Sequence, residues 1–175
     1  MTTWEYLDTE ETNKRRELTY GMVREPPAPF FCHQSVVLKV ARMLCDHVEP
    51  RGLGRVGIAP IDVILDRDRA LVVQPDVLFV AAERESIIRD QVWGAPDLVV
   101  EVLSAGTVAR DRHEKLGWYR QYGVRECWLI DLHREAVVIV DFTTPGSVRR
   151  EAHGIVAIRS TVLPSLEAAP FVLFT

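Results

Sequence analysis

The sequence lacks any long hydrophobic run. No apolar stretch approaches the roughly 20 residues that a helix needs to cross a bilayer. The first 17 residues, MTTWEYLDTEETNKRRE, are charged and do not form the apolar centre of a secretory signal. These absences predict a protein with no membrane partner, and we expect it in the cytoplasm.

Cysteine is scarce. The chain has three, Cys32, Cys45 and Cys127, which are far apart and form no C-x-x-C pair. Zinc and redox sites usually need such pairs, so neither is indicated. The odd number and wide spacing predict buried free thiols in a reducing compartment.

An excess of positive charge is also missing. The 21 lysines and arginines are outnumbered by 25 aspartates and glutamates, and the net charge is −4. This balance argues against the broad cationic surface of proteins that bind nucleic acid nonspecifically. It leaves a nuclease open, because a bound cation reverses the local field of clustered carboxylates.

What is present is the composition of an ordinary globular protein. Of 175 residues, 47% are hydrophobic and 26% are charged. We find no internal repeat, low-complexity linker or break in composition. The sequence therefore predicts one domain that spans residues 1–175.

The first third predicts a short helix, a hairpin and a long helix. Thr2 and Glu5 fit a capping box for a helix over residues 4–7. Residues 17–25 read as two short strands that turn near Gly21. Residues 32–48 have apolar side chains at steps of three and four, which is typical of an amphipathic helix: Val36, Val37, Val40, Met43, Leu44 and either His47 or Val48.

The glycines that follow need a separate reading. Gly52, Gly54 and Gly57 formally match the dinucleotide-binding pattern G-x-G-x-x-G. They follow a helix and precede a strand, which is the reverse of the context that the pattern requires. We interpret them as helix termination and loop.

The remainder predicts a mixed sheet. Residues 58–65 and 70–80 are β-rich runs joined by a polar hairpin tip, and residues 98–103 form a strand apolar on both sides, hence central. A helix over residues 110–122, ending at Gly123, leads to a strand pair at residues 126–131 and 136–142. The apolar tail at residues 163–175 packs back. The predicted class is α/β, of the mixed α+β kind: a mixed central β-sheet flanked by helices, with an N-terminal β-hairpin.

Two carboxylates and a lysine carry the candidate chemistry. Asp76 follows Gln74-Pro75, Glu101 interrupts a strongly apolar strand, and Lys115 lies on the next helix. Carboxylates on neighbouring strands can share a hard divalent cation such as Mg²⁺, and Mn²⁺ accepts similar ligands. The lysine could then face a phosphate or a water molecule.

Structural explanations stand beside this one. Asp76 could cap the turn after Pro75, and Arg110 or Lys115 could compensate the buried charge of Glu101. Asp111 and Lys115 are four residues apart on one helix face, where an exposed ion pair contributes only about 0.3–0.5 kcal/mol. Ser104 lies outside any G-x-S-x-G elbow, and we expect its hydroxyl to cap the strand exit.

The order and spacing of several fragments form a specific pattern. They are Pro75-Asp76-Val77, Leu98-Val99-Val100-Glu101-Val102-Leu103-Ser104, Asp111 with Lys115 and Tyr119, and Gly123-Val124-Arg125-Glu126-Cys127-Trp128-Leu129-Ile130-Asp131. Weaker parts of the pattern are residues 17–21, His33 and Leu163-Pro164-Ser165-Leu166. With these fragments, the chain resembles, nearly end to end, the Uma-type bacterial restriction endonuclease family (DUF820-like) of the PD-(D/E)xK nuclease superfamily.

The resemblance implies a restriction-endonuclease-like core with a metal between Asp76, Glu101 and the backbone carbonyl of Val102. The superfamily's lysine two positions after the glutamate is absent, because Leu103 stands there, and the family supports Lys115 as its replacement. An acidic residue expected just after the hairpin glycine is replaced by Met22.

A third carboxylate role would therefore fall to Glu17 or Glu25. Glu17, His33 and Asp111 are secondary candidates for the site, and a capping or partly buried role is an alternative for His33.

The implied activity is a Mg²⁺-dependent endonuclease acting on DNA, without an organic cofactor. Cutting both strands of a duplex usually requires two sites, so we expect a homodimer. One alternative is a nucleic-acid-binding or regulatory module that keeps the fold and has little or no catalysis. Another is a structural oligomer without a nucleic-acid role.

Overall fold

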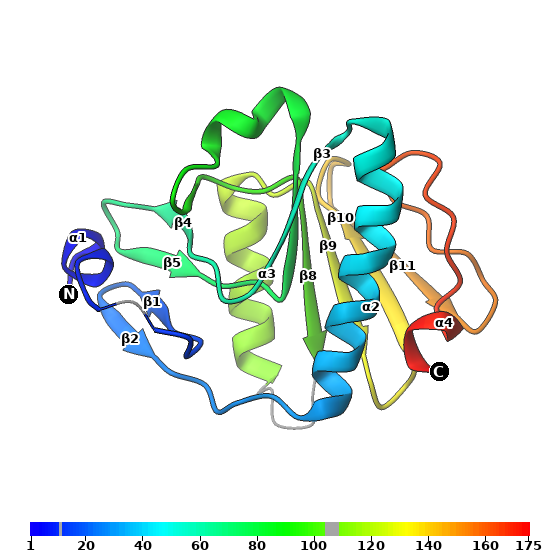
Figure 1. Ribbon diagram of the computed structural model, residues 1–175, viewed down its shortest axis with the longest axis horizontal. Helices are drawn as coiled ribbons and strands as arrows, with labels where there is room; N and C mark the ends of the chain where they lie inside the picture. The colour runs from blue at the N-terminus through cyan, green and yellow to red at the C-terminus, as the bar shows by residue number, and fades with distance from the viewer. Residues whose placement is uncertain (11, 104–108) are drawn as a thin grey trace.

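A computed structural model describes residues 1–10, 12–103 and 109–175, with the side chains of residues 109–112 left out. Figure 1 shows the arrangement. The elements in chain order are α1 (Thr3–Leu7), β1 (Glu17–Thr19), β2 (Met22–Arg24), α2 (Phe31–Val48), the 3-10 helix η1 (Glu49–Arg51), β3 (Gly54–Ile58), β4 (Val63–Asp66), β5 (Leu71–Val73), β6 (Val77–Ala81), the 3-10 helix η2 (Ala82–Ile87), β7 (Val92–Trp93), β8 (Leu98–Leu103), α3 (Ala109–Tyr122), β9 (Glu126–Asp131), β10 (Ala136–Asp141), β11 (Val148–His153) and α4 (Phe171–Phe174).

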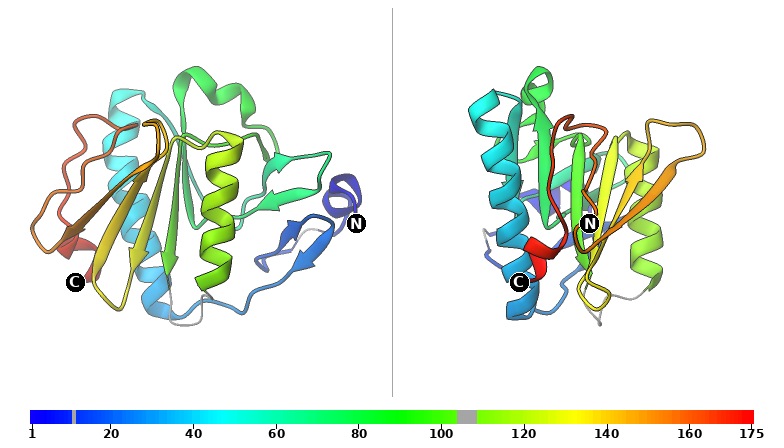
Figure 2. Two further views of the ribbon diagram at one scale, coloured as in Figure 1. Left: turned by 180° about the vertical axis from the view of Figure 1, so that it is seen from behind. Right: turned by 90° about the vertical axis from the view of Figure 1, so that its right-hand side faces the viewer.

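A six-stranded sheet with order β11-β10-β9-β8-β6-β3 is the centre of the fold. β8 and β9 are parallel and joined through α3, and the other neighbours are antiparallel. The right-hand view of Figure 2 shows α2 and α3 on opposite faces of this sheet. The central position of β8, the crossover through α3 and the β9–β10 hairpin confirm the predicted order.

Side-chain alternation along β8 assigns its residues to the two faces. Val100 and Val102 pack in the core cluster that contains the buried stripe of α2. Val99 and Leu103 pack in the cluster that contains Leu116 and Tyr119 of α3. Because successive strand residues point to opposite faces, Glu101 faces α3.

A second, five-stranded sheet has the order β2-β1-β5-β4-β7 and lies beside the first (Figure 1). It includes the predicted N-terminal hairpin, β1 with β2. Val63 and Val73 of this sheet share one core cluster with Val80 and Val99 of the six-stranded sheet. The two sheets are therefore joined by apolar packing as well as by the chain.

The predicted strand over residues 70–80 is wrong in one respect. The chain forms β5, leaves the small sheet at Gln74-Pro75-Asp76, and enters the large sheet as β6. Residues 71–80 are all buried, because the shared core covers both halves. Asp76 therefore lies at the junction between the sheets.

The glycine-rich segment after α2 also differs from its prediction. Gly52 caps η1 with a left-handed backbone, as expected of helix termination, but Gly54 already begins β3. A Cβ at Gly54 would lie 2.0 Å from the carbonyl oxygen of Val80. Glycine is required there because β3 and β6 approach so closely.

Several smaller predictions have outcomes here. The capping box of Thr2 and Glu5 is formed, and the tail packs back through buried Leu163 and Leu173. The cysteines are free, as predicted, but only Cys127 is buried, because Cys32 lies on the exposed first turn of α2. The proposed cap by Ser104 lies outside the described residues.

The sequence predicted no membrane-spanning helix. In the part of the chain that the structure describes, no helix combines the length and hydrophobicity that a membrane span requires.

Candidate functional site

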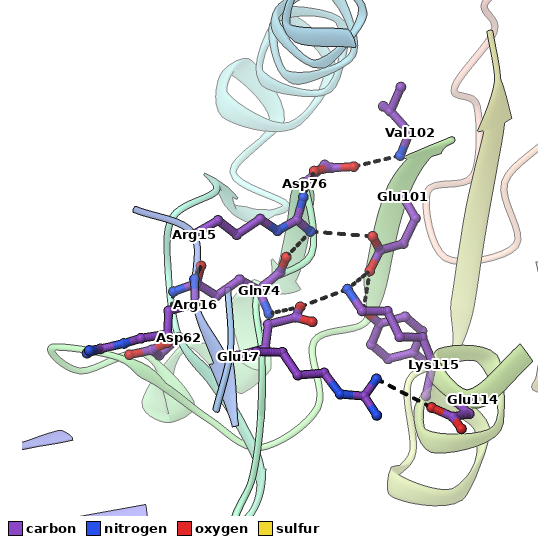
Figure 3. A network of polar contacts seen from close by, with 12 residues as sticks. Arg15, Arg16, Glu17, Asp62, Gln74, Asp76, Glu101, Val102, Glu114 and Lys115 are labelled. Atoms are coloured by element: carbon purple, nitrogen blue, oxygen red, sulfur yellow. Dashed lines mark hydrogen bonds and ion pairs between the residues drawn. The ribbon is translucent and has the colours of Figure 1, made fainter. Parts of the chain in front are cut away.

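Charged side chains from four parts of the chain meet between the two sheets (Figure 3). Arg15 precedes β1, Glu17 lies in β1, Asp76 lies at the junction, Glu101 is in β8 and Lys115 is in α3. The fold thus gathers the predicted trio with two residues from the N-terminal region. This cluster is the candidate site.

Both carboxylate oxygens of Asp76 are contacted by groups that can donate hydrogen bonds. Its Oδ2 accepts the backbone N–H of Val102 at 2.7 Å and lies 3.4 Å from Nε2 of His33. Its Oδ1 accepts Nη1–H of Arg15 at 2.6 Å. The residue is 2% exposed, so its orientation is fixed by these contacts.

The two carboxylate oxygens of Glu101 also have different partners. Its Oε1 accepts the hydroxyl of Tyr119 at 2.5 Å and the Nζ ammonium of Lys115 at 3.1 Å. Its Oε2 lies 3.6 Å from Nη2 of Arg15. Tyr119 is fully buried, so it sets the position of the Glu101 carboxylate against α3.

Lys115 bridges the two sheets. Its Nζ donates to Oε1 of Glu17 at 2.7 Å as well as to Glu101. Glu17 also accepts the backbone N–H of Gln74 at 2.8 Å. The Lys115 ammonium therefore points into the site; the ion pair considered with Asp111 stays untested, because the side chain of Asp111 lies outside the described residues.

A hydrogen-bond chain continues from Gln74 into the small sheet. The side-chain amide of Gln74 donates to Asp62 at 3.0 Å and accepts the backbone N–H of Arg16 at 3.0 Å. Asp62 also accepts the hydroxyl of Tyr6 at 3.0 Å. These contacts fix the segment that positions Arg15 and Asp76.

The environment shifts the pKa values of the two predicted metal-binding carboxyls in opposite directions. Burial works to raise the pKa of Asp76, but the hydrogen bond from His33 and the charge of Arg15 outweigh it and lower the pKa. Burial raises the pKa of Glu101, and Lys115 offsets only part of this effect. Asp76 is the stronger anion of the pair.

The carboxyl groups around Lys115 favour its charged form. Burial would lower the pKa of Lys115, yet Glu101 and Glu17 raise it. Burial would raise the pKa of Glu17, yet Lys115 and Arg15 lower it. Lys115 is thus a cation with two carboxylate partners at neutral pH.

The residues present fit a hard divalent cation with few protein ligands. Among the described residues, no three histidine, cysteine, aspartate or glutamate side chains are grouped to hold a metal ion. Asp76 and Glu101 are two carboxylates that already share one cationic partner, Arg15. Because Mg²⁺ keeps several waters and needs only one or two carboxylates, this donor set suits it.

The structure brings most of the sequence-predicted residues together. Asp76, Glu101 and Lys115 share the site, and Glu17 supplies the third carboxylate, whereas Glu25 is exposed beyond β2. Val102 contributes its N–H to Asp76, and its carbonyl as a ligand stays a prediction.

The two remaining secondary candidates have different outcomes. His33 is buried in the first turn of α2 against Asp76. The side chain of Asp111 lies outside the described residues.

Sequence reasoning missed Arg15, which it assigned to a polar stretch. One signal could have found it: Arg15 stands two residues before Glu17, the spacing that places side chains on one face of an extended chain. Gln74 was noted only as part of the motif, and its linking role depends on contacts that no spacing reveals.

Comparison with solved structures identifies the class of protein. A crystal structure described as "a putative nuclease belonging to DUF820", from Anabaena variabilis ATCC 29413, superposes with a TM-score of 0.84, covering 99% of this chain and 97% of that chain. The two sequences are 18% identical, so the likeness shows the fold. The mixed sheets and flanking helices match a restriction-endonuclease-like nuclease fold.

The family follows from the sequence. The family model Uma2, described as "Putative restriction endonuclease", matches residues 3–169. The chain belongs to this family, as the sequence motifs indicated. A search of curated proteins gives no match.

Proposed function

We propose that this protein is a Mg²⁺-dependent endonuclease that hydrolyses DNA phosphodiester bonds. The observation that supports it most is the pairing of Asp76 with Glu101 at the sheet junction. Each carboxylate has one oxygen held by fixed donors, and its other oxygen faces the guanidinium of Arg15. Family membership supports a nuclease.

The two carboxylates would hold the cation, with the Val102 carbonyl as an additional ligand. Bound Mg²⁺ would supply Lewis-acid polarisation of a phosphoryl oxygen and a more acidic water, and Mn²⁺ would substitute. Tyr119 and Val102 would keep the carboxylates in place by the hydrogen bonds described above.

Lys115 would act on the substrate. Its ammonium lies between Glu17 and Glu101, from where it can orient the attacking water or donate to the phosphorane as negative charge develops. This role compensates for Leu103, which occupies the superfamily's lysine position and cannot supply a charge.

A nucleic-acid-binding or regulatory module without efficient catalysis is the second candidate. Two observations favour it: the absence of the usual lysine at Leu103, and Arg15, whose guanidinium contacts both carboxylates. The test below separates this module from the enzyme, because a module would bind DNA without cutting it.

We also propose a cytoplasmic homodimer. One site per chain cuts one strand, so cleavage of a duplex needs two chains presented together. Sedimentation of the protein with and without DNA checks this part; a monomer in both conditions would contradict it.

Plasmid and oligonucleotide cleavage tests the enzyme. Supercoiled plasmid and labelled DNA oligonucleotides are incubated with Mg²⁺, Mn²⁺ or a chelator. We expect cutting that needs the metal, is abolished in Asp76→Asn and Glu101→Gln, and is reduced at least tenfold in Lys115→Arg, since general-acid and electrostatic contributions are typically about 10²-fold or more.

Glu25→Gln is the matched control, because Glu25 is an exposed carboxylate outside the site. It should cut like the wild type, and a contaminating nuclease would survive every substitution. DNA retardation in a gel without cutting would move the assignment to the binding module, and neither binding nor cutting of DNA or RNA would favour a structural oligomer.

A further inference from the structure

We propose that Arg15 is a resident counter-ion of the carboxylate pair, which a divalent cation must displace in order to bind. This inference rests on the proposed function, because it concerns the metal that Asp76 and Glu101 would hold. It assigns a role to a residue that lies outside the motifs quoted in the sequence analysis. Figure 3 shows the Arg15 side chain reaching from the segment before β1 toward both carboxylates.

The oxygens that Arg15 contacts carry the argument. Val102 and His33 occupy Oδ2 of Asp76, and Tyr119 and Lys115 occupy Oε1 of Glu101. The oxygens left for a further cation are Oδ1 of Asp76 and Oε2 of Glu101. These are the two that the guanidinium approaches, at 2.6 and 3.6 Å.

The third contact of Arg15 has the same character. Its Nη2 donates to the backbone carbonyl oxygen of Gln74. Two carboxylate oxygens and one carbonyl oxygen are the ligand types that hard divalent cations prefer. The guanidinium therefore contacts the same two carboxylate oxygens that the metal would use, together with a carbonyl oxygen of the type that such a metal accepts as a ligand.

The charge balance makes exchange more favourable than addition. Counted as ionised, Glu17, Asp76 and Glu101 contribute three negative charges, and their partners Arg15 and Lys115 contribute two positive charges. Replacing Arg15 by Mg²⁺ leaves this group neutral. Keeping both would place two cations side by side in a largely buried site, where like charges repel strongly.

Exchange needs only a side-chain movement. Every described polar contact of Arg15 is made by its guanidinium, and its side chain is 21% exposed. The neighbouring Arg16 holds the backbone, because its N–H bonds to Gln74 and its guanidinium lies 4.9 Å from the ring centre of Tyr6. Arg15 can therefore leave the carboxylates while the segment stays attached.

Calorimetric titration of the full-length protein with Mn²⁺ and with Mg²⁺ tests the displacement. If Arg15 occupies the site about 90% of the time, removing it raises the apparent metal affinity about tenfold. We therefore expect Arg15→Gln to bind both ions about tenfold more tightly than the wild type. Arg42→Gln is the matched control, because the Arg42 side chain is 82% exposed and lies outside the site, and its affinity should equal that of the wild type.

The opposite sign distinguishes competition from support. If Arg15 only stabilised the site, Arg15→Gln would bind metal equally or more weakly, and this result would overturn the inference alone. If the wild type, Arg15→Gln and Arg42→Gln all bind no metal, the proposed metal dependence itself fails, together with the inference.

A second measurement uses the wild type and does not depend on the variant folding. p-Hydroxyphenylglyoxal modifies accessible guanidinium groups, and mass spectrometry gives the rate at Arg15. We expect Mn²⁺ to raise this rate and a chelator to reverse the effect, with the rate at Arg16 unchanged. An unchanged or lower rate at Arg15 under saturating metal would contradict displacement.

Discussion

Lys115 combines an observed structural role with a proposed chemical one. Its ammonium contacts a carboxylate of each sheet, Glu17 in β1 and Glu101 in β8. Without it, two largely buried carboxylates would face each other with reduced compensation. Any loss of activity in a Lys115 variant must therefore be separated from a loss of stability.

We expect Lys115→Met to lower the free energy of unfolding by about 3–5 kcal/mol at neutral pH, the usual cost of breaking a buried ion pair. Urea denaturation followed by circular dichroism measures it. Glu17→Gln combined with Lys115→Met should recover part of the loss, because it removes one of the two buried carboxylates that lose their lysine partner. Additive losses in the double variant would show that the two residues are not coupled.

The site was predictable from sequence to the extent that its residues lie in ordered motifs. Asp76, Glu101 and Lys115 could be named because the resemblance to the family favoured the metal reading over the structural explanations that stood beside it. Arg15 could not, because its role depends on how a short coil folds back over residues that lie about 60 and 85 positions further along the chain.

At the scale of elements, the periodicity of the sequence was informative wherever one element packs on one face. The long helix α2 and the crossover from β8 through α3 to β9 were predicted with boundaries close to those observed. The division of residues 70–80 was missed, because both sheets bury their part of the run and the hydrophobic pattern continues across the junction.

The C-terminal end of α2 carries a pH-dependent contribution to stability. His47 is buried there, and its Nε2 has no hydrogen-bond partner among the described residues. Burial lowers its pKa, the charge of Arg51 lowers it further, and a hydrogen bond to Pro164 offsets only part of this. Folding thus favours the neutral imidazole.

We expect this contribution to be lost on acidification. Between the lowered folded-state pKa and the ordinary value of about 6.5, the unfolded chain binds more protons than the folded one, so stability falls as the pH falls through that range. Unfolding free energies from pH 8 to 5 measure it. In His47→Gln this decline should be smaller than in the wild type, whereas the exposed His133→Gln should leave it unchanged; equal declines in all three proteins would refute the assignment.

At the scale of the whole molecule, the two sheets share their interior. Val63, Leu71 and Val73 of the small sheet pack in the same cluster as Val80 and Val99 of the large sheet. The ion pair between Glu17 and Lys115 adds a polar connection across the same junction. We therefore propose that residues 1–175 form one domain, as the composition predicted.

One cooperative unfolding transition is the expected outcome. Far-ultraviolet circular dichroism reports both sheets, and fluorescence of a chain that keeps only Trp93 or only Trp128 reports the small or the large sheet separately. The midpoints in urea should coincide, because the two sheets share one buried apolar cluster. Separate midpoints would mean that the small sheet unfolds as an independent unit.

The three residues Gln74-Pro75-Asp76 cross from one sheet to the other, and this has a pharmacological consequence. A small molecule that wedged the sheets slightly apart would draw Glu17 and Arg15 away from Glu101 and Lys115 without touching any of them. Inhibition of the proposed nuclease activity would then be noncompetitive with DNA, and selectivity would depend on the apolar residues at the junction instead of on the proposed metal-binding carboxylates.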